Sequence, residues 1–405
     1  MSATSDEQYK VRFIDSITDV DVKQWSAVAK VGSEKQIQYP FVQYGFLRAL
    51  EVTGVTTRKT GWQPHHLTVY SQGELVAFLP LYLKFHSYGE YVFDWSWAEA
   101  YERHGVEYYP KLLSCIPYTP SAGPRLCVKQ GEAEAEISSL VMKSLLSCAE
   151  QLRLSSIHVL FPQQKFHCQL QESGLSSRVG TQFHWFNQGY ESFDDFLGTF
   201  ASRKRKNVRK ERKKVEQHNL TIKVHEGEDI DDTLWEHFFH FYQRTYLKRS
   251  GHGGYLNQAF FKAVAKEMPH QLVMMVAYEN ERPIAAALNF KDSDTLYGRY
   301  WGCEKELDFL HFETCYYQGI EYCIEQGLSR FDPGAQGEHK ISRGFTPIET
   351  WSNHWIAHPQ FKAAIDDFLL QEREGSQQYI QQCKELLPFK AECIKPVIKK
   401  SSDDD

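Results

Sequence analysis

The sequence predicts an α/β (α+β) protein of two similar units in tandem, each with a mixed central sheet flanked by helices. A chain of 405 residues is long enough for about two domains with full cores. The strand–turn–strand pattern of VYSQGELVAF (69–78) recurs in AYENERPIAA (277–286), at an offset of 208 residues. A helix followed by a strand recurs at 131–162 and 311–333, at an offset near 171. Two matches in the same order indicate an internal duplication.

The difference between the two offsets indicates an insertion in the first copy. It is about 37 residues, close to the length of an aromatic, turn-rich segment at 85–126. Long connections inside a compact domain are either functional or disordered, and the many Tyr and Trp residues indicate that this one is ordered. We expect domains at 1–185 and 186–375, followed by a peripheral helix and a disordered acidic tail at 376–405.

The spacing of apolar residues and the positions of Gly and Pro define the expected elements. In the first half they predict a strand at 9–14, short helices near 20–30 and at 93–105, a helix from Pro40 to Gly54, a hairpin at 66–84, a helix at 131–154 and a strand at 156–162. In the second half they predict a basic helix at 202–215, a helical segment at 234–248, a hairpin at 273–290, a strand from 296, a helix at 311–327 and a strand at 328–333.

Composition and charge exclude several classes of protein. The net charge of −6 gives no overall attraction to nucleic acid, so any basic site must be local. The nine cysteines are odd in number and form no CxxC pair, which is typical of reduced thiols in a cytosolic protein. No secretory signal or membrane-spanning run is present, so we expect a cytoplasmic protein. The sequence lacks HExxH and GxSxG, and His237 and His240 are expected to be packing residues, so no metal site is predicted.

The segment 193–219 carries the strongest local charge. Nine of the twelve residues 203–214 are Lys or Arg, and an apolar helical stripe beneath them is interrupted by Lys204 and Glu211. Such a helix could hold the phosphates of a nucleotide, a cofactor or RNA. It could equally be a solvated face whose long side chains cover apolar surface. Both interpretations stay open on sequence alone.

The loop 332–345 gathers titratable residues between glycines at the end of a predicted strand. Glu338 or His339 could act as a general base there, with Asp332 as a further catalytic candidate. Lys340 and Arg343 could hold an anionic ligand. The alternative is an exposed polar turn. Ligand contact by this loop is the prediction that we retain.

Three further candidates lie outside this loop. In DWSWAEAYERHG (93–105), Glu99 and Glu102 lie within one helical turn and could share acid–base work, although such residues usually lie on the surface. Tyr109 and Arg299 are further candidates for substrate or anion binding. The Gly-rich string RSGHGGY (249–255) is neither a Walker loop nor a dinucleotide fingerprint, and it is either a substrate-covering loop or a helix terminator.

Three segments together resemble a known family. SWAEAYERHGVEYYPKLLSCIPYTPSAGPRL, SRKRKNVRKERKKV and LHFETCYYQGIEYCIEQGLSRFDPGAQGEHKISRGFTP look like the FemAB-like predicted N-acyltransferases, a branch of the Gcn5-related acetyltransferase (GNAT) superfamily. The resemblance covers roughly residues 40–375. The chain is also similar, more distantly, to peptidoglycan-bridge aminoacyltransferases, which have two acetyltransferase-like domains in tandem. The resemblance therefore implies two tandem GNAT domains, in agreement with the duplication.

The resemblance also implies roles for the basic helix. In those aminoacyltransferases the matching helix lies near phosphates of the donor or acceptor, which points to Arg203, Arg205, Lys206 and Arg209 here. One departure concerns the cofactor. After the strand that ends at Phe290 the sequence reads KDSDTLYG, without the pyrophosphate loop by which acetyltransferases usually bind coenzyme A. Acyl-coenzyme A and aminoacyl-tRNA both remain open as donors.

We therefore expect an N-acyltransferase that moves an acyl or aminoacyl group onto a small-molecule or nucleotide-linked amine. The second copy is expected to do the chemistry, because the first-half counterpart of the polar loop, FPQQKFHCQLQE, has no glycine and one carboxylate. The site is expected in a cleft between 93–109 and 332–345, lined on one side by the basic helix. The competing interpretation is a duplicated binding module that has no catalytic activity and binds RNA or another anionic partner through 203–214.

Overall fold

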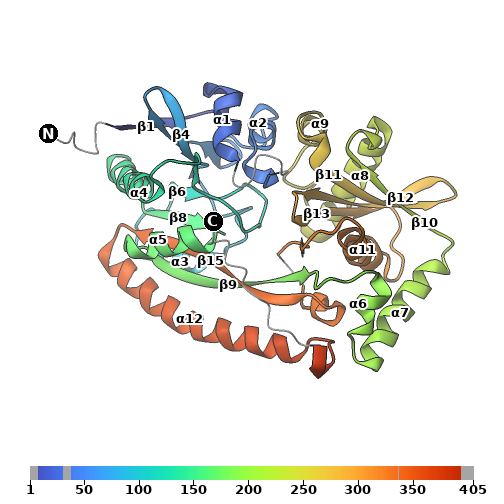
Figure 1. The fold of residues 1–405 in the computed structure, drawn as a ribbon. Coiled ribbons are helices and arrows are strands. Elements are labelled where there is room, and N and C mark those ends of the chain that lie inside the picture. Colours follow the sequence, from blue (N-terminus) through green and yellow to red (C-terminus); the bar gives the residue numbers. More distant parts are fainter. Residues whose placement is uncertain (1–7, 31–37, 336, 394–405) are drawn as a thin grey trace.

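The computed structural model describes residues 8–30, 38–335 and 337–393. Its first half agrees with the expected order of elements (Figure 1). The strands are β1 (Tyr9–Ile14), β2 (Trp62–Pro64), β3 (His66–Ser71), β4 (Glu74–Leu79), β5 (Tyr82–Lys84), β6 (Lys111–Ser114), β7 (Cys127–Val128), β8 (Ser156–Leu160) and β9 (Ser176–Phe186). The helices are α1 (Val22–Ala29), α2 (Tyr44–Val52), α3 (Trp95–Arg103), α4 (Glu134–Gln151) and α5 (Gln164–Glu172).

The second half begins with the basic segment and ends with a long helix. Its helices are α6 (Phe193–Gly198), α7 (Ser202–Glu216), α8 (Asp232–Ser250), α9 (Gln258–Glu267), α10 (Leu310–Phe312), α11 (Gln318–Glu325) and α12 (Pro359–Glu385). Its strands are β10 (Thr221–Glu226), β11 (Leu272–Glu279), β12 (Arg282–Lys291), β13 (Thr295–Cys303), β14 (Arg330–Asp332) and β15 (Thr346–Ile356). A π-helical turn at Glu313–Tyr317 joins α10 to α11, and a 3-10 helix, Glu338–Arg343, stands where a polar loop was expected.

The two hairpins confirm the duplication in detail. The β3–β4 pair shifts register at Val69/Tyr70, and the β11–β12 pair does so at Ala277/Tyr278, at the same offset of 208 residues. In each turn the two central residues, Gln72–Gly73 and Asn280–Glu281, have positive φ. Turns of this kind match the twist of paired strands. The copies therefore share irregularities as well as elements.

The second half of each copy shows the same correspondence. A helix leads from β6 to a parallel partner, β8, and likewise from β13 to its parallel partner, β14. The copies then exchange their last strands. β9 follows β8 in the chain but pairs with β14, and β15 follows β14 but pairs with β8. β9 and β15 also pair with each other, so one sheet runs through both halves in the order β10-β11-β12-β13-β14-β9-β15-β8-β6-β5-β2.

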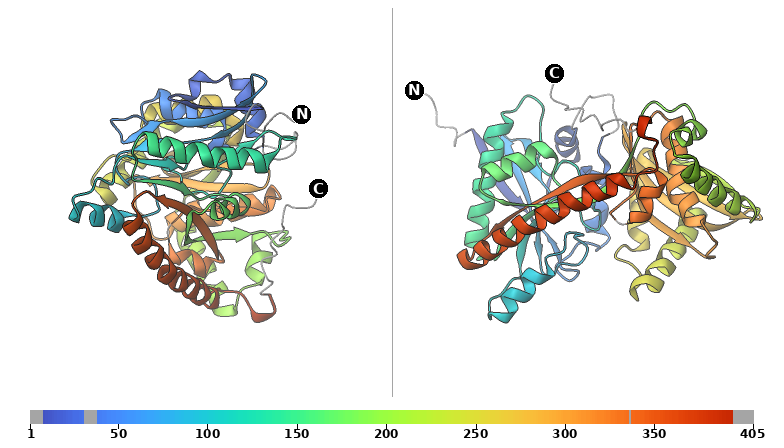
Figure 2. Two further views of the ribbon diagram at one scale, coloured as in Figure 1. Left: turned by 90° about the vertical axis from the view of Figure 1, so that its left-hand side faces the viewer. Right: turned by 90° about the horizontal axis from the view of Figure 1, so that it is seen from below.

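The long helix α12 also connects the halves. It runs along β9 and β15 (Figure 2). Its first part buries Ile365 and Leu369 against Trp97 of the first half, and its last turns bury Cys383 in the second-half core. The expected boundary between 375 and 376 falls inside α12, and 394–405 of the expected acidic tail lie outside the described residues.

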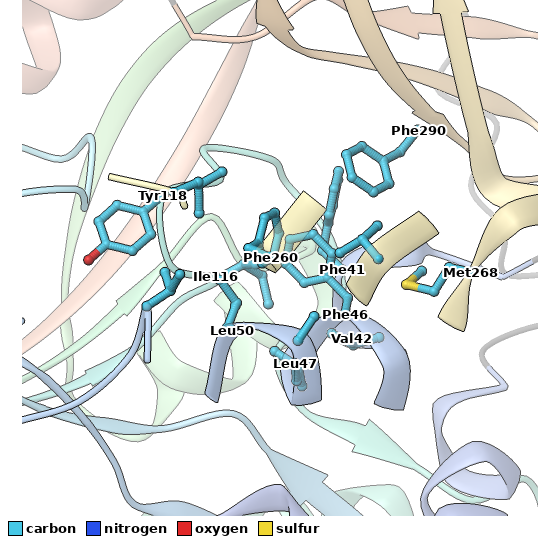
Figure 3. Close-up of a cluster of buried hydrophobic side chains, with 14 of the residues drawn as sticks. Phe41, Val42, Phe46, Leu47, Leu50, Ile116, Tyr118, Phe260, Met268 and Phe290 are labelled. Atoms are coloured by element: carbon cyan, nitrogen blue, oxygen red, sulfur yellow. The ribbon is translucent and has the colours of Figure 1, made fainter. Parts of the chain in front are cut away.

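An apolar core fills the space between α2 and α9 (Figure 3). Phe46 of α2 lies 5.6 Å from Phe260 of α9 and 5.7 Å from Phe290 of β12, measured between ring centroids. A Cβ on Gly45 would lie 2.8 Å from Glu267 Cβ, so the close approach of the helices requires glycine there. The halves are thus joined by a shared sheet, a shared helix and a shared core.

Candidate active site

A cavity of about 440 Å³ lies between the halves. β12, β13, the end of α8 and the start of the α10–α11 region form one side of it. The first-half insertion forms the opposite side, which includes Phe93 and Trp95, and Pro333–Ala335 of the polar loop lie at its edge. The two segments of the expected cleft therefore meet in part. Residues of α7 are not among the described residues that line this cavity.

β13 and β14 separate where the cavity begins. They pair in parallel as far as Tyr297 and Asp332, where β14 ends, while β13 continues to Cys303. Beyond Tyr297, β13 is paired with β12 alone among the described strands. A register shift between β12 and β13 makes Arg299 the extra residue of a bulge. The free edge of β13 thus borders the cavity.

The corresponding opening in the first half is filled. β6 and β8 pair in parallel in the same way, but residues 115–125 occupy the space beyond them. Arg125 is fully buried there and donates from Nε to the Leu160 carbonyl (2.8 Å) and from Nη2 to the Ser121 carbonyl (2.6 Å). Of the two equivalent openings, the one in the second half is therefore the accessible one.

Asp332 and Arg299 form a buried ion pair at the base of the cavity. Arg299 donates to the two carboxylate oxygens over 2.6 and 3.2 Å, and each side chain is 1% exposed. Ser121 Oγ and the Gly334 N–H also donate to this carboxylate. Burial alone would raise the pKa of Asp332, but Arg299 and then His184 hold it well below its usual range. A carboxylate that stays charged and fully engaged positions Arg299 and is a poor proton acceptor.

The two cations of the polar loop are also engaged by the protein. Lys340 is buried and donates to the carbonyl oxygens of Gly334 (2.6 Å) and Pro333 (3.3 Å). Burial lowers the pKa of Lys340 to about 7. Arg343 donates to both carboxylate oxygens of Glu211 at 2.8 Å. This pair explains why a carboxylate interrupts the apolar stripe of α7. Lys340 and Arg343 therefore shape the loop.

The two candidate bases lie in different surroundings. Glu338 is exposed and accepts a hydrogen bond from Tyr379 (2.8 Å). His339 is exposed as well, but its Nε2 lies 2.8 Å from the hydroxyl of Tyr316, a buried residue that lines the cavity. Burial lowers the pKa of His339 to about 4 and raises that of Tyr316. A Cβ on Gly337, whose φ is 116°, would lie 2.2 Å from the His339 ring. His339 thus reaches the cavity through Tyr316.

The charge inside the cavity is positive. Arg249, at the end of α8, lines it and has no ion-pair or hydrogen-bond partner among the described residues. Burial, and then the charge of Arg249, lowers the pKa of His311 in the same cavity to about 3. No Asp or Glu is among the described residues that line it. Sequence reasoning missed Arg249 and Tyr316, although Arg249 begins the Gly-rich string RSGHGGY.

The basic helix α7 packs on the second half through two of its cations. Arg212 binds Glu313 and Glu321 at 2.8 Å, and Lys214 binds Asp308 at 2.5 Å. Arg209 pairs with Asp194 at the surface. Six further cations have no ion-pair partner in the described part of the chain: Arg203, Lys204, Arg205, Lys206, Lys210 and Lys213. The helix is thus anchored on one face and leaves a cationic face in solvent.

The predicted carboxylates of α3 do not reach the cavity. Glu99 and Glu102 are exposed on α3, outside the described cavity lining. Tyr109 is half-buried, and its hydroxyl lies 2.8 Å from Ser87 Oγ, which borders the cavity. Tyr109 is therefore one contact away from the site.

In this fold a pyrophosphate loop would lie at a different position from the one that the sequence indicated. The segment after Phe290 is the β12–β13 turn, whereas the loop that enters a helix beside the open strands is 304–309. That loop carries Glu304, Glu306 and Asp308 and contains no glycine. These carboxylates pair with Arg282, Lys248 and Lys214, so the feature that the loop lacks is a glycine that lets the backbone approach a phosphate.

The described residues lack two features. They contain no group of three or more His, Cys, Asp or Glu side chains that could hold a metal ion. None of the helices in the described ranges is long and apolar enough to span a membrane.

Comparisons with known proteins identify a family and several solved structures of similar fold. A family model for FemAB-like proteins, described as peptidoglycan biosynthesis/recognition, matches residues 16–391. The structure of FemX is similar, with a TM-score of 0.51 and 13% identity over 86% of this chain and 98% of FemX. The C-terminal domain of a putative lysylphosphatidylglycerol synthetase from Agrobacterium fabrum has a TM-score of 0.53 and 10% identity, over 88% of this chain and 98% of that one.

A tandem GNAT protein from the clavulanic acid biosynthesis pathway has a TM-score of 0.48 and 10% identity, over 87% of this chain and 99% of that one. No curated protein matches the sequence. The predicted fold class, two acetyltransferase-like units in tandem, is confirmed.

Proposed function

The chain belongs to the FemAB-like family, and we propose that this acyltransferase joins an activated acyl or aminoacyl group to an amine in the cavity between β13 and β14. The observation that carries the proposal is the free edge of β13. Backbone groups that have no strand partner seek hydrogen bonds elsewhere, and an extended acyl or amide group can supply them. The first half cannot serve in this way because residues 115–125 fill its opening.

The Tyr316–His339 pair is the proposed proton carrier. The amine nitrogen attacks the acyl carbonyl carbon, the C–N bond forms, and the bond from this carbon to the leaving oxygen or sulfur breaks. Tyr316 oxygen takes the proton of the amine while its own proton moves to His339 Nε2, and the reverse transfer protonates the leaving atom. Positive charge and the absence of carboxylates from the described lining favour the neutral, reactive form of the amine.

We infer that the activated donor is an aminoacyl-tRNA. The loop 304–309, which enters α10, has no glycine that would let its backbone approach a pyrophosphate closely. By contrast, the cationic face of α7 suits a phosphate backbone, and Arg212 and Arg343 anchor this helix beside the α10–α11 region. The experiment is a transfer assay with labelled aminoacyl-tRNA or acyl-coenzyme A and a panel of amines. Transfer from tRNA is expected, and transfer from coenzyme A alone would overturn this choice of donor.

We expect Arg249 to bind an anionic group of one of the two substrates in the cavity. Arg249→Gln should therefore raise KM for that substrate by about tenfold, with a small change in kcat. A charge-assisted hydrogen bond is worth roughly 1.5–3 kcal/mol, and its loss affects substrate and transition state alike. Steady-state kinetics check this expectation. Arg244→Gln is the matched control, because Arg244 is an exposed arginine of the same helix that lies outside the described cavity lining. Equal kinetics for the two variants would remove Arg249 from the site.

A second candidate function, RNA binding without chemistry, is favoured by the same cationic face. Arg203, Lys206, Lys210 and Lys213 are exposed and lie three or four residues apart, on one side of α7. Changing all four to Gln should lower the slope of log K against log salt for RNA by about 3, since each single-strand phosphate contact contributes about 0.7. Filter binding at several salt concentrations measures the slope.

The control for this experiment changes four exposed lysines on the first half to Gln: Lys10, Lys23, Lys59 and Lys143. An equal loss of slope in the control would mean that RNA responds to net charge alone. RNA binding that survives in a Tyr316→Phe variant with strongly reduced transfer activity is expected from an enzyme with a tRNA donor. RNA binding by a wild-type protein that transfers nothing would favour the second candidate.

A further inference from the structure

Lys111 of β6 gathers three side chains from the segment that forms the outer side of the cavity. Its Nζ lies 2.9 Å from Ser87 Oγ, 2.9 Å from Glu90 Oε2 and 2.5 Å from Asp94 Oδ2. All four residues are buried, and the Lys111 side chain is 0% exposed. One ammonium group thus cross-links both ends and the middle of an eight-residue segment.

This segment buries its charged side chains and exposes aromatic ones, the reverse of the usual arrangement in a protein. Its charged residues point inward to Lys111, while three of its aromatic residues and Trp95, which follows it, have partly exposed side chains that line the cavity. We call these four residues, Tyr88, Tyr91, Phe93 and Trp95, the aromatic wall. Phe93 is 57% exposed and Tyr88 is 56% exposed. Burying charges while exposing large apolar rings is costly unless the charges are paired, so this arrangement depends on the buried pairing.

Two further details show that the pairing overrides local preferences. Lys84 of β5 lies directly opposite Lys111 in the sheet, an unfavourable like-charge pair, and Glu90 lies between their ammonium groups. Asp94 stands at the start of α3, where an aspartate usually caps the helix, yet its side chain makes no cap and binds Lys111 and Tyr108 instead.

We propose that Lys111 is a positioning residue for the transfer reaction: by binding Ser87, Glu90 and Asp94 it holds the aromatic wall against the cavity. The role in the reaction rests on the proposed function, whereas the hold on the wall does not. Tyr91 has a left-handed backbone (φ 61°), a strained conformation for a bulky residue that the surrounding contacts must maintain. Rings fixed in this way recognise an apolar or planar part of the substrate.

A double-mutant cycle tests whether Lys111 acts through the wall. Phe93→Ala removes one wall ring, and Lys111→Met removes the ammonium at similar side-chain length. Each should raise KM by about tenfold and change kcat by less than about threefold, because the wall contacts the substrate away from the reacting atoms. The double variant should be no worse than Lys111→Met alone, since coupled residues are not additive. Additive losses in KM, or a loss confined to kcat, would overturn the proposal.

Hydrogen exchange tests the hold on the wall without any substrate. Lys111→Met should speed amide exchange across 86–95 by about tenfold or more, because local opening sets the exchange rate, and β11 should keep its protection. The variant Lys111→Met/Asp94→Asn leaves Glu90 paired with Lys84 and should show the same local increase, which guards against a variant that fails to fold. Glu51→Gln breaks a buried contact with His66 away from the wall and is the matched control.

Unchanged exchange at 86–95 in Lys111→Met/Asp94→Asn, or an equal increase there in Glu51→Gln, would overturn the proposal. If the wild-type protein transferred no acyl group, the exchange result would still decide whether Lys111 holds the wall. Failure of the proposed function and failure of this inference are therefore distinguishable.

Discussion

Asp332→Asn should lower the free energy of unfolding by about 3–5 kcal/mol, because removing one partner of a buried ion pair leaves the other charge unpaired in the core. Arg299 is that other charge, and its side chain is 1% exposed. Arg299 Nε finds no acceptor among the described residues, so no second carboxylate is in place to replace Asp332. Urea unfolding at neutral pH measures the loss.

Two further variants serve as comparisons for Asp332→Asn. Asp194→Asn breaks the exposed pair with Arg209 and should cost at most about 1 kcal/mol. The double variant Arg299→Met/Asp332→Asn should recover part of the stability, because no charge is left unpaired. It should not recover transfer activity, since the bulge residue of β13 has changed. A loss below about 1 kcal/mol in Asp332→Asn would contradict the buried pairing.

The same residue gives a pH dependence with a defined sign. The pKa of Asp332 is lower in the folded protein than its ordinary value of about 3.9, so its contribution to stability is present above about pH 4 and is lost as the pH falls further. Buried histidines lower the stability of the folded protein at a higher pH than Asp332 does. Burial lowers the pKa of His158 and of His184 to about 3, so the unfolded chain takes up their protons first below about pH 6.5.

Thermal unfolding between pH 8 and pH 3 should therefore show two stages of loss in the wild-type protein. The first begins near pH 6.5, and the second begins near pH 4. In Asp332→Asn the first stage should remain and the second should shrink. A second stage of unchanged size in the variant would assign the acid loss to other carboxylates.

Tyr316→Phe should lower kcat by about 10²–10³-fold, which is within the range of general acid–base groups. The substitution keeps the ring and removes the hydroxyl that lies 2.8 Å from His339 Nε2. His339→Gln should cause a similar loss, and the double variant should lose little more, because the two residues act as one carrier. Single-turnover rates measure the effect.

The controls for this prediction separate the candidate bases. Tyr317→Phe removes the neighbouring hydroxyl, which binds Glu211 and lies outside the described cavity lining, and should leave kcat within about threefold of wild type, since it makes no contact in the reaction. Glu338→Gln should behave in the same way, because Glu338 is exposed and bound to Tyr379. A large loss in Glu338→Gln, together with near-normal rates in Tyr316→Phe, would reverse the assignment.

The pH profile of the reaction provides an independent check. The pKa of His339 is lowered to about 4 and that of Tyr316 is raised, so neither group titrates between pH 5 and 9. The rate should therefore rise with pH in step with deprotonation of the acceptor amine. An inflection near pH 6.5 that moved in His339→Gln would contradict the lowered pKa of His339.

Most secondary structure was predictable because its signals are local. The hairpin at 273–290, the basic helix and the helix–strand unit around 311–333 follow from apolar spacing and from turn residues within a few positions of one another. The duplication was also predictable, since β11–β12 repeats the turn and even the register shift of β3–β4 at a fixed offset. Each of these features depends on residues that are close together in the chain.

The roles of the charged residues were much less predictable. Asp332, Lys340 and Arg343 suggested ligand contact, because a sequence does not show which charges are already paired. Arg343 binds Glu211, which lies 132 positions earlier, and Lys340 binds backbone carbonyls of its own loop. Arg249, which has no such partner in the described residues, was named only as part of a Gly-rich string.

Local signals in the sequence predicted the two hairpins, the two helix–strand units, their duplication and the insertion in the first copy, but not β9, β10 or β15. Tertiary structure decided that the copies exchange β9 and β15, that residues 115–125 fill one opening, and that the other opening holds a cavity. The two kinds of feature depend on interactions of different range along the chain. Backbone conformation follows neighbours in the chain, whereas the pairing of β8 with β15 and of Glu211 with Arg343 joins segments more than 100 residues apart.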